Sequence, residues 1–80
     1  MSHKLSRGQI DVVLSRVKQH HGCASEEATF VRVHRAHGMP DGAEGARLDY
    51  RQFLALQRTK LPPYITAEYQ EYFGMIVVVT

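Results

Sequence analysis

The stretch from residue 38 to residue 61, GMPDGAEGARLDYRQFLALQRTKL, constrains the fold of this chain most strongly. Asp49 can cap the start of a helix there, because its carboxylate and the side chain of Gln52 can each satisfy a backbone N–H of the first turn. Apolar residues follow at helical spacing and give this helix one face to bury. They are Tyr50, Phe53, Leu54 and Leu61.

The residues on either side of this stretch set the ends of the predicted helix. Residues 40–47 are rich in Gly and Ala and predict a loop before it. Arg58 and Lys60 fall in its last turn, where the helix dipole favours positive charge. Pro62 and Pro63 then stop the helix, because the residue before a proline is pushed out of the helical region.

Two further amphipathic helices precede this stretch. The first is predicted from about residue 7 to residue 20, with Ser6 as N-cap and Gly22 as the stop. The second begins after Ser25 and ends before Gly38. The apolar residues at helical spacing in the three helices predict the core. They are Ile10, Val13, Leu14, Val17, Phe30, Val31, Phe53 and Leu54.

The last quarter of the chain carries mixed signals. Residues 67–73, AEYQEYF, predict a short helix capped by Thr66 that ends at Gly74. Alternatively, residues 64–72 form a strand, because aromatic and β-branched residues are frequent there. Residues 75–80, MIVVVT, are typical of a strand, and a single strand needs a partner. That partner is residues 64–66, the same strand of a second copy, or another protein.

These patterns predict one small domain over residues 1–80. We expect a mainly α fold with three to four helices and a short C-terminal β-strand or hairpin. Pairing of residues 75–79 across a two-fold axis would make the protein a homodimer.

Charge, cysteine content and hydropathy indicate the cellular compartment in which we expect the protein. All ten Lys and Arg lie within residues 1–60 beside six acidic residues, for a net charge of +2 over the whole chain. A single cysteine excludes an internal disulfide, and no stretch approaches the roughly 18 apolar residues of a membrane span. We therefore expect a cytoplasmic protein without a membrane segment.

The segment 28–57 resembles a degenerate EF-hand helix–loop–helix. Asp41 matches the first ligand position and Leu48 the apolar eighth position of that loop. The remaining ligands are missing, since Ala43 and Gly45 carry no side-chain oxygen and Gln52 replaces the closing Glu. The resemblance implies a calcium-free helix–loop–helix used for packing or partner binding, and an ordinary capped helix after a loop is the alternative.

Histidines and the one cysteine give a spacing that a zinc site could use. His20 and Cys23 form His-x-x-Cys, and His34 and His37 form His-x-x-His. If one helix spans the residues between the pairs, they lie about 15 Å apart, at about 1.5 Å per residue. The pattern therefore favours ordinary histidines and a partly buried thiol over a zinc site, and no metal or cofactor is expected.

The sequence lacks a phosphate-binding loop, a Gly-x-Ser-x-Gly motif and a paired-carboxylate motif, so we do not expect an enzyme. We expect a small protein-interaction module that acts as a regulator, adaptor or inhibitor on a protein partner. The candidate contact residues are Tyr64, Tyr69, Tyr72, Phe73, Ile76 and Val78.

The alternative function is nucleic-acid binding by a helix-turn-helix-like pair formed by the first two helices. The basic faces of residues 1–60 would then contact phosphates. The candidate residues for this function are Arg32, Arg35, Arg51 and Arg58.

Overall fold

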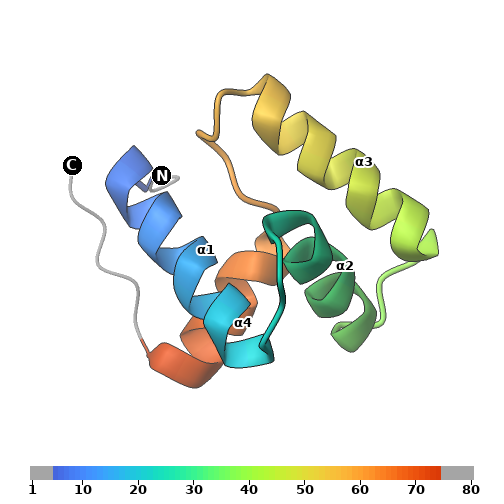
Figure 1. Ribbon diagram of the computed structural model, residues 1–80, viewed down its shortest axis with the longest axis horizontal. Coiled ribbons are helices and arrows are strands. Elements are labelled where there is room, and N and C mark those ends of the chain that lie inside the picture. The colour runs from blue at the N-terminus through green and yellow to red at the C-terminus, as the bar shows by residue number, and fades with distance from the viewer. Residues whose placement is uncertain (1–4, 75–80) are drawn as a thin grey trace.

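Four helices make up the computed structural model, which describes residues 5–74 (Figure 1). They are α1 (Arg7–His21), α2 (Glu26–Ala36), α3 (Gly42–Ala55) and α4 (Pro63–Phe73). The mainly helical fold is confirmed, and no strand occurs within residues 5–74. The strand predicted at residues 75–80 lies outside the described residues, whereas residues 64–66, one of its three expected partners, belong to α4 and cannot pair with it as a strand. Within the same part of the chain, no helix combines the length and apolar character that crossing a membrane requires.

The helices α1 and α2 form where their caps predict them. The side chain of Ser6 accepts a hydrogen bond from the backbone N–H of Gln9, and the Gln9 side chain accepts one from the N–H of Ser6, each at 3.2 Å. Gly22 ends α1 in the left-handed region, at φ 66°. Ser25 caps α2 by accepting a hydrogen bond from the N–H of Ala28 at 3.1 Å.

The prediction for α3 is wrong at both ends. This helix begins at Gly42, so residues 42–47 are helical rather than a loop, and the residues aligned with a calcium-binding loop are helical from Gly42 to Gln52. Asp49 lies inside the helix and does not cap it. The helix ends at Ala55, so Arg58 and Lys60 follow it instead of lying in its last turn.

Small residues place the first half of α3 close to α2. Ala46 is fully buried, and a Cβ added at Gly45 would lie 2.7 Å from the Cβ of Asp41 and 3.5 Å from Nε2 of His34. A side chain at position 45 would therefore clash with Asp41, the N-cap of α3 itself, whereas His34 of α2 lies at an ordinary contact distance. Avoiding this clash offsets the low intrinsic helix propensity of glycine.

Residues 63–73 form a helix, which settles the alternative between helix and strand. Pro63 begins α4, since proline lacks only an N–H that the first turn leaves unpaired. Thr66 does not cap the helix; its hydroxyl donates to the carbonyl of Pro63 at 2.9 Å. The two prolines therefore start α4 and do not stop α3.

One apolar core joins the helices. Its buried residues are Ile10, Val13, Leu14, Val17, Phe30, Val33, Phe53, Leu61, Tyr64 and Ile65. Phe30 is fully buried at its centre and makes ring contacts with Tyr50, Phe53 and Tyr64. Two predictions of core residues are wrong: Val31 is half-buried, and Leu54 is 45% exposed because α3 turns Ala46 and Phe53 inward.

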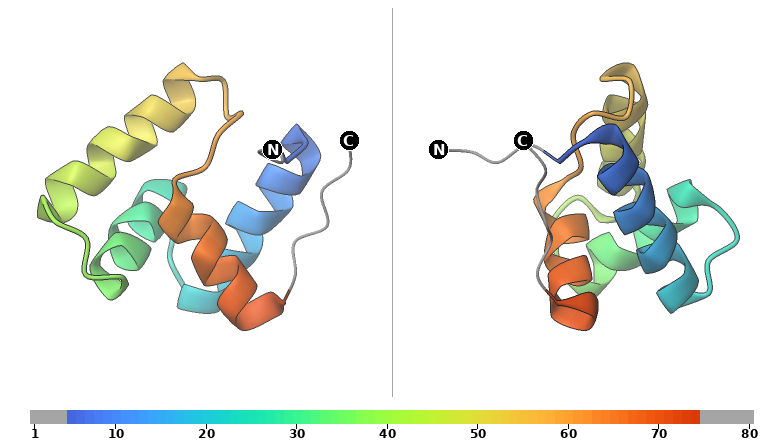
Figure 2. Two further views of the ribbon diagram at one scale, coloured as in Figure 1. Left: turned by 180° about the vertical axis from the view of Figure 1, so that it is seen from behind. Right: turned by 90° about the vertical axis from the view of Figure 1, so that its left-hand side faces the viewer.

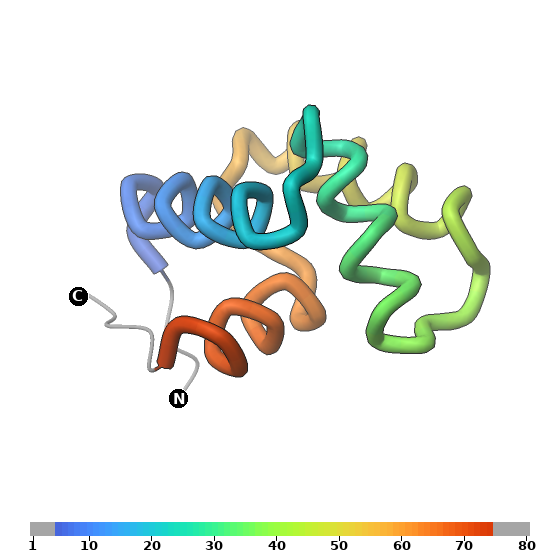
Figure 3. Tube along the Cα trace, turned by 60° about the horizontal axis from the view of Figure 1, so that its bottom comes forward, coloured from blue at the N-terminus to red at the C-terminus, as the bar shows by residue number. Residues whose placement is uncertain are grey.

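The helix α2 lies at the centre of the arrangement and contacts each of the other three helices (Figures 2 and 3). α1 packs against α2 and α4, whereas α3 packs closely against α2 alone. The linker from Ala55 to Pro63 carries the chain from the outer end of α3 back to α4 (Figure 2). One side of α3 therefore faces α4, and residues of both helices line a groove between them.

Candidate functional site

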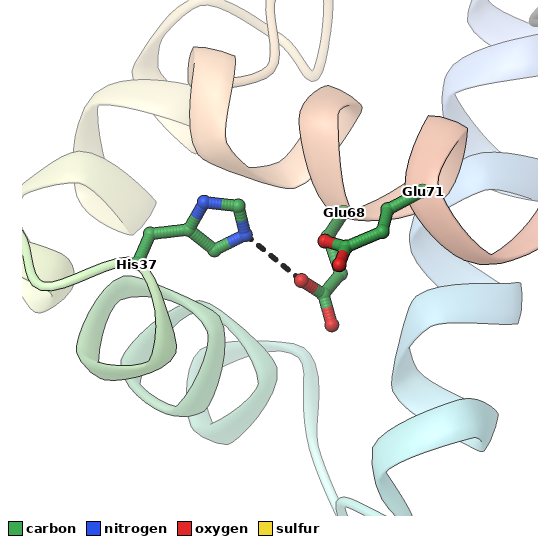
Figure 4. Close-up of side chains that lie close together, drawn as sticks. All are labelled: His37, Glu68 and Glu71. Carbon is green, nitrogen blue, oxygen red and sulfur yellow. Dashed lines mark hydrogen bonds and ion pairs between the residues drawn. The ribbon is translucent and has the colours of Figure 1, made fainter.

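The ends of α1 and α2 meet the middle of α4 at a histidine–glutamate cluster. Glu68 of α4 accepts a hydrogen bond from Nε2 of His37, which follows α2, at 2.8 Å between Nε2 and Oε1 (Figure 4). Its other carboxylate oxygen, Oε2, contacts Nε2 of His21, the last residue of α1. The side chain of Glu68 is 4% exposed, so its carboxylate is almost entirely removed from water.

The two histidines keep the buried carboxylate ionised. Burial on its own raises the pKa of Glu68, because a charged group loses its hydration. The hydrogen bonds with His37 and His21, and the positive charge that each can carry, outweigh burial and hold the pKa below its ordinary value. No lysine or arginine of the described residues forms an ion pair with Glu68.

A second carboxylate lies one helical turn further along α4. Glu71 is exposed, and it projects from the same side of α4 as Glu68 (Figure 4). His37, Glu68 and Glu71 each offer one ligand atom, and these atoms all lie within 4.8 Å of one another. Sequence reasoning did not find this group, because His37 is 31 residues away from Glu68 and no local motif links them.

An apolar groove of about 500 Å³ lies between α3 and α4. It is lined by His37, Met39, Asp49, Gln52, Phe53, Leu56, Lys60, Leu61, Pro62, Pro63, Tyr64 and Ala67. Met39 is 43% exposed and Leu56 is 40% exposed, so both present apolar surface to solvent at the groove. Large exposed apolar side chains gathered at one concave site are typical of a binding surface.

A hydrogen bond across the groove ties α3 to α4. The hydroxyl of Tyr64 donates to Oδ2 of Asp49 at 2.8 Å. Burial raises the pKa of Tyr64, and the hydrogen bond and negative charge of Asp49 raise it further. Asp49 thus joins two helices instead of capping one. Tyr64, a candidate contact residue, is only 4% exposed and belongs to the core.

The other described aromatic candidates gather at the C-terminal end of α4. Tyr69 stacks on Phe73 with ring centroids 5.2 Å apart, and His20 packs on Tyr72 at 4.2 Å. Tyr72 is 53% exposed and Phe73 is 39% exposed, whereas Tyr69 is half-buried. The candidates Ile76 and Val78 lie outside the described residues.

The four candidate arginines do not form one surface. Arg32 and Arg35 line a polar hollow that also includes Cys23 and Arg47. Arg51 is exposed on α3 and does not line this hollow.

Arg58, the remaining candidate arginine, forms ion pairs with two carboxylates of the protein itself. It donates to both carboxylate oxygens of Glu26, at 2.7 and 2.8 Å, and to Asp11 at 3.0 Å. Its guanidinium is therefore already neutralised by carboxylates, so Arg58 has little capacity left to contact a phosphate.

The four residues considered as zinc ligands lie in different environments and do not converge on one site. His34 is 4% exposed and packs edge-on against Tyr64 at 5.2 Å. His20 packs on aromatic rings of α4, and Cys23 lies in the polar hollow. Of these four, only His37 belongs to a group of three neighbouring metal-ligating side chains among residues 5–74.

No protein-family model, curated protein or solved structure matches this chain.

Proposed function

We propose that this chain is a non-enzymatic module that binds a protein partner through the groove between α3 and α4. The observation that carries the proposal is the exposure of Met39 and Leu56 at a concave apolar surface of about 500 Å³. Exposed apolar side chains in a pocket are where binding energy between proteins concentrates. Such a module would act on its partner as a regulator, adaptor or inhibitor.

The charges at the groove specify the partner's chemistry. Lys60 lines the groove and forms no ion pair with any described residue. Asp49 and His37, the other ionisable groups of the lining besides Tyr64, are already bound to Tyr64 and Glu68. The partner is therefore an apolar segment of a protein with an acidic residue beside it, placed to meet Lys60.

Selection from a random peptide library on the full chain tests this proposal. The selected peptides should be rich in large apolar residues with an adjacent Asp or Glu. Leu56→Ser should weaken their binding at least about tenfold, since it removes an apolar contact from the groove. Leu48→Ser is the matched control, because Leu48 is 57% exposed on the same helix and does not line the groove. Lys60→Glu should shift the preference from acidic to basic peptides.

Two outcomes would contradict the groove as the binding surface. One is equal weakening by Leu48→Ser and Leu56→Ser. The other is weakening by Phe73→Ser without any effect of Leu56→Ser, which would place the interface at the aromatic end of α4. Circular dichroism of each variant checks that its helices are intact.

Nucleic-acid binding remains a second proposal, because Arg32, Arg35 and Arg47 line one hollow. The connection between α1 and α2, residues 22–25, is as short as a helix-turn-helix connection. If Arg32 contacts a phosphate, Arg32→Gln should weaken binding to mixed-sequence duplex and lower the slope against salt by about one. Absence of binding at low salt would remove this proposal.

A further inference from the structure

The cluster at the meeting point of α1, α2 and α4 contains the side chains that a transition-metal site requires. An imidazole and two carboxylates converge there from His37, Glu68 and Glu71. Carboxylate oxygens and imidazole nitrogens are ligands of zinc and neighbouring divalent metals. From this convergence we propose that the chain binds one divalent transition-metal ion, with Zn²⁺ as the probe, through these three side chains.

The spacing of the ligand atoms fits a metal ion after a small adjustment. Nε2 of His37 and Oε1 of Glu68 are 2.8 Å apart, so they would exchange their hydrogen bond for the metal and separate slightly, because ligands 2.0–2.2 Å from a tetrahedral zinc are roughly 3.4 Å apart. The three ligand atoms of the group lie within 4.8 Å of one another, so the wider distances must shorten. Closing this difference requires a movement of about 1 Å. Glu71 can supply it, because its side chain is exposed and makes no hydrogen bond or ion pair with another described residue.

The cluster also contains a side chain, His21, that would orient the metal-binding carboxylate of Glu68. His21 contacts Oε2 of Glu68, which leaves Oε1 on the side of His37. Hydrogen bonds from neighbouring side chains commonly fix ligating carboxylates in this way. His21 is therefore a positioning residue, and the ligands are His37, Glu68 and Glu71.

The charge of the cluster favours a cation. Glu68 is 4% exposed, and the carboxylate of Glu71, one helical turn away, lies close to it. Among residues 5–74, no lysine or arginine forms an ion pair with either carboxylate. The histidines hydrogen-bond to Glu68, but Glu71 has no positive partner among the described residues, so the two neighbouring carboxylates still favour a further positive charge. A divalent ion supplies that charge, and His37, 25% exposed, with the exposed Glu71, leaves an entry path open.

Calorimetric titration of Zn²⁺ into the full, untagged chain after chelator treatment tests the proposal. We expect one ion bound per chain and, at about 100 times the dissociation constant, a rise in Tm of about 10 °C. Glu71→Gln should reduce the affinity at least about tenfold, without affecting the fold, because Glu71 is exposed. Glu44→Gln is the control, since it removes one exposed acidic charge from α3 that is not among the three clustered ligands.

A second measurement separates ligation from a general effect of charge. Co²⁺ bound to the parent should give visible absorption bands, and these should change in His37→Gln but not in His20→Gln. Absence of saturable Zn²⁺ binding would overturn the proposal and leave the cluster as a purely hydrogen-bonded one. Equal losses in Glu71→Gln and Glu44→Gln, or a loss in Cys23→Ser with none in Glu71→Gln, would also overturn it.

Discussion

At the scale of single residues, Arg58 holds the most heavily connected position on the surface. It lies beyond the end of α3, yet it donates to Glu26 of α2 and Asp11 of α1, and its guanidinium lies 5.0 Å from the ring centroid of Phe53. Its backbone adopts φ 59°, in the left-handed region. A position predicted as the last turn of a helix therefore links three helices. Single-sequence reasoning identified the residue and its charge but not its two carboxylate partners, which are 32 and 47 residues away.

The bond between Arg58 and Glu26 predicts a pH dependence of stability. Arg58 lowers the pKa of Glu26 below its ordinary value of 4.5, chiefly through hydrogen bonding and against the effect of burial. A lowered pKa in the folded state means that the stabilisation is complete above pH 4.5 and is lost as the pH falls through the folded value. Glu26→Gln should therefore cost about 1 kcal/mol at pH 7 and much less at pH 3.

Urea unfolding at the two pH values measures this difference. Glu27→Gln is the control, because Glu27 is 51% exposed and its pair with Arg47 is longer, at 3.5 Å. That change should stay within about 0.5 kcal/mol at both pH values. A Glu26→Gln penalty as large at pH 3 as at pH 7 would show that the carboxylate charge is not what stabilises the fold.

At the scale of elements, the helices differ in how far local sequence determines them. Ser6 and Ser25 carry cap signals that act within one turn, so α1 and α2 could be predicted from sequence. The start of α3 could not, because it depends on the burial of Ala46 and on the space that Gly45 leaves beside Asp41. The same holds for α4, whose aromatic residues suit either a helix or a strand until the core is assembled.

The close approach at Gly45 predicts a reversal of the usual helix preference. Alanine is a better helix former than glycine by about 1 kcal/mol. A Cβ at Gly45 would nevertheless lie 2.7 Å from the Cβ of Asp41, so Gly45→Ala should destabilise the protein. Gly8→Ala is the control in α1, where nothing lies within 4 Å, and it should be neutral or stabilising. Thermal unfolding compares the two, and stabilisation by Gly45→Ala would contradict the close contact between Gly45 and Asp41 at the start of α3.

The orientation of α3 predicts unequal effects at two adjacent positions. Phe53 is 1% exposed and Leu54 is 45% exposed. Phe53→Ala should cost about 3–5 kcal/mol of unfolding free energy, because it removes a ring from the centre of the core. Leu54→Ala should cost less than about 1 kcal/mol. Similar costs in urea unfolding would mean that α3 presents another face to α2.

At the scale of the whole molecule, α2 organises the fold; α3 packs on α2 and is tied to α4 by one hydrogen bond across the groove. An 80-residue domain buries only about 60–65% of the surface of its unfolded chain. A groove with exposed Met39 and Leu56 adds apolar surface that the domain itself does not cover. The sequence could predict a helical domain, but it could not place the groove, because its lining within residues 37–67 comes together only when α3 and α4 lie beside each other.

The groove is tested most directly by NMR chemical-shift mapping of the isotope-labelled chain with the tightest selected peptide. We expect the largest amide shifts at Met39, Leu56 and Ala67, which line the groove. Arg32 and Arg35 should shift little, because they lie on the polar hollow. Shifts confined to those arginines, or to the C-terminal end of α4, would contradict binding of a protein partner in the groove.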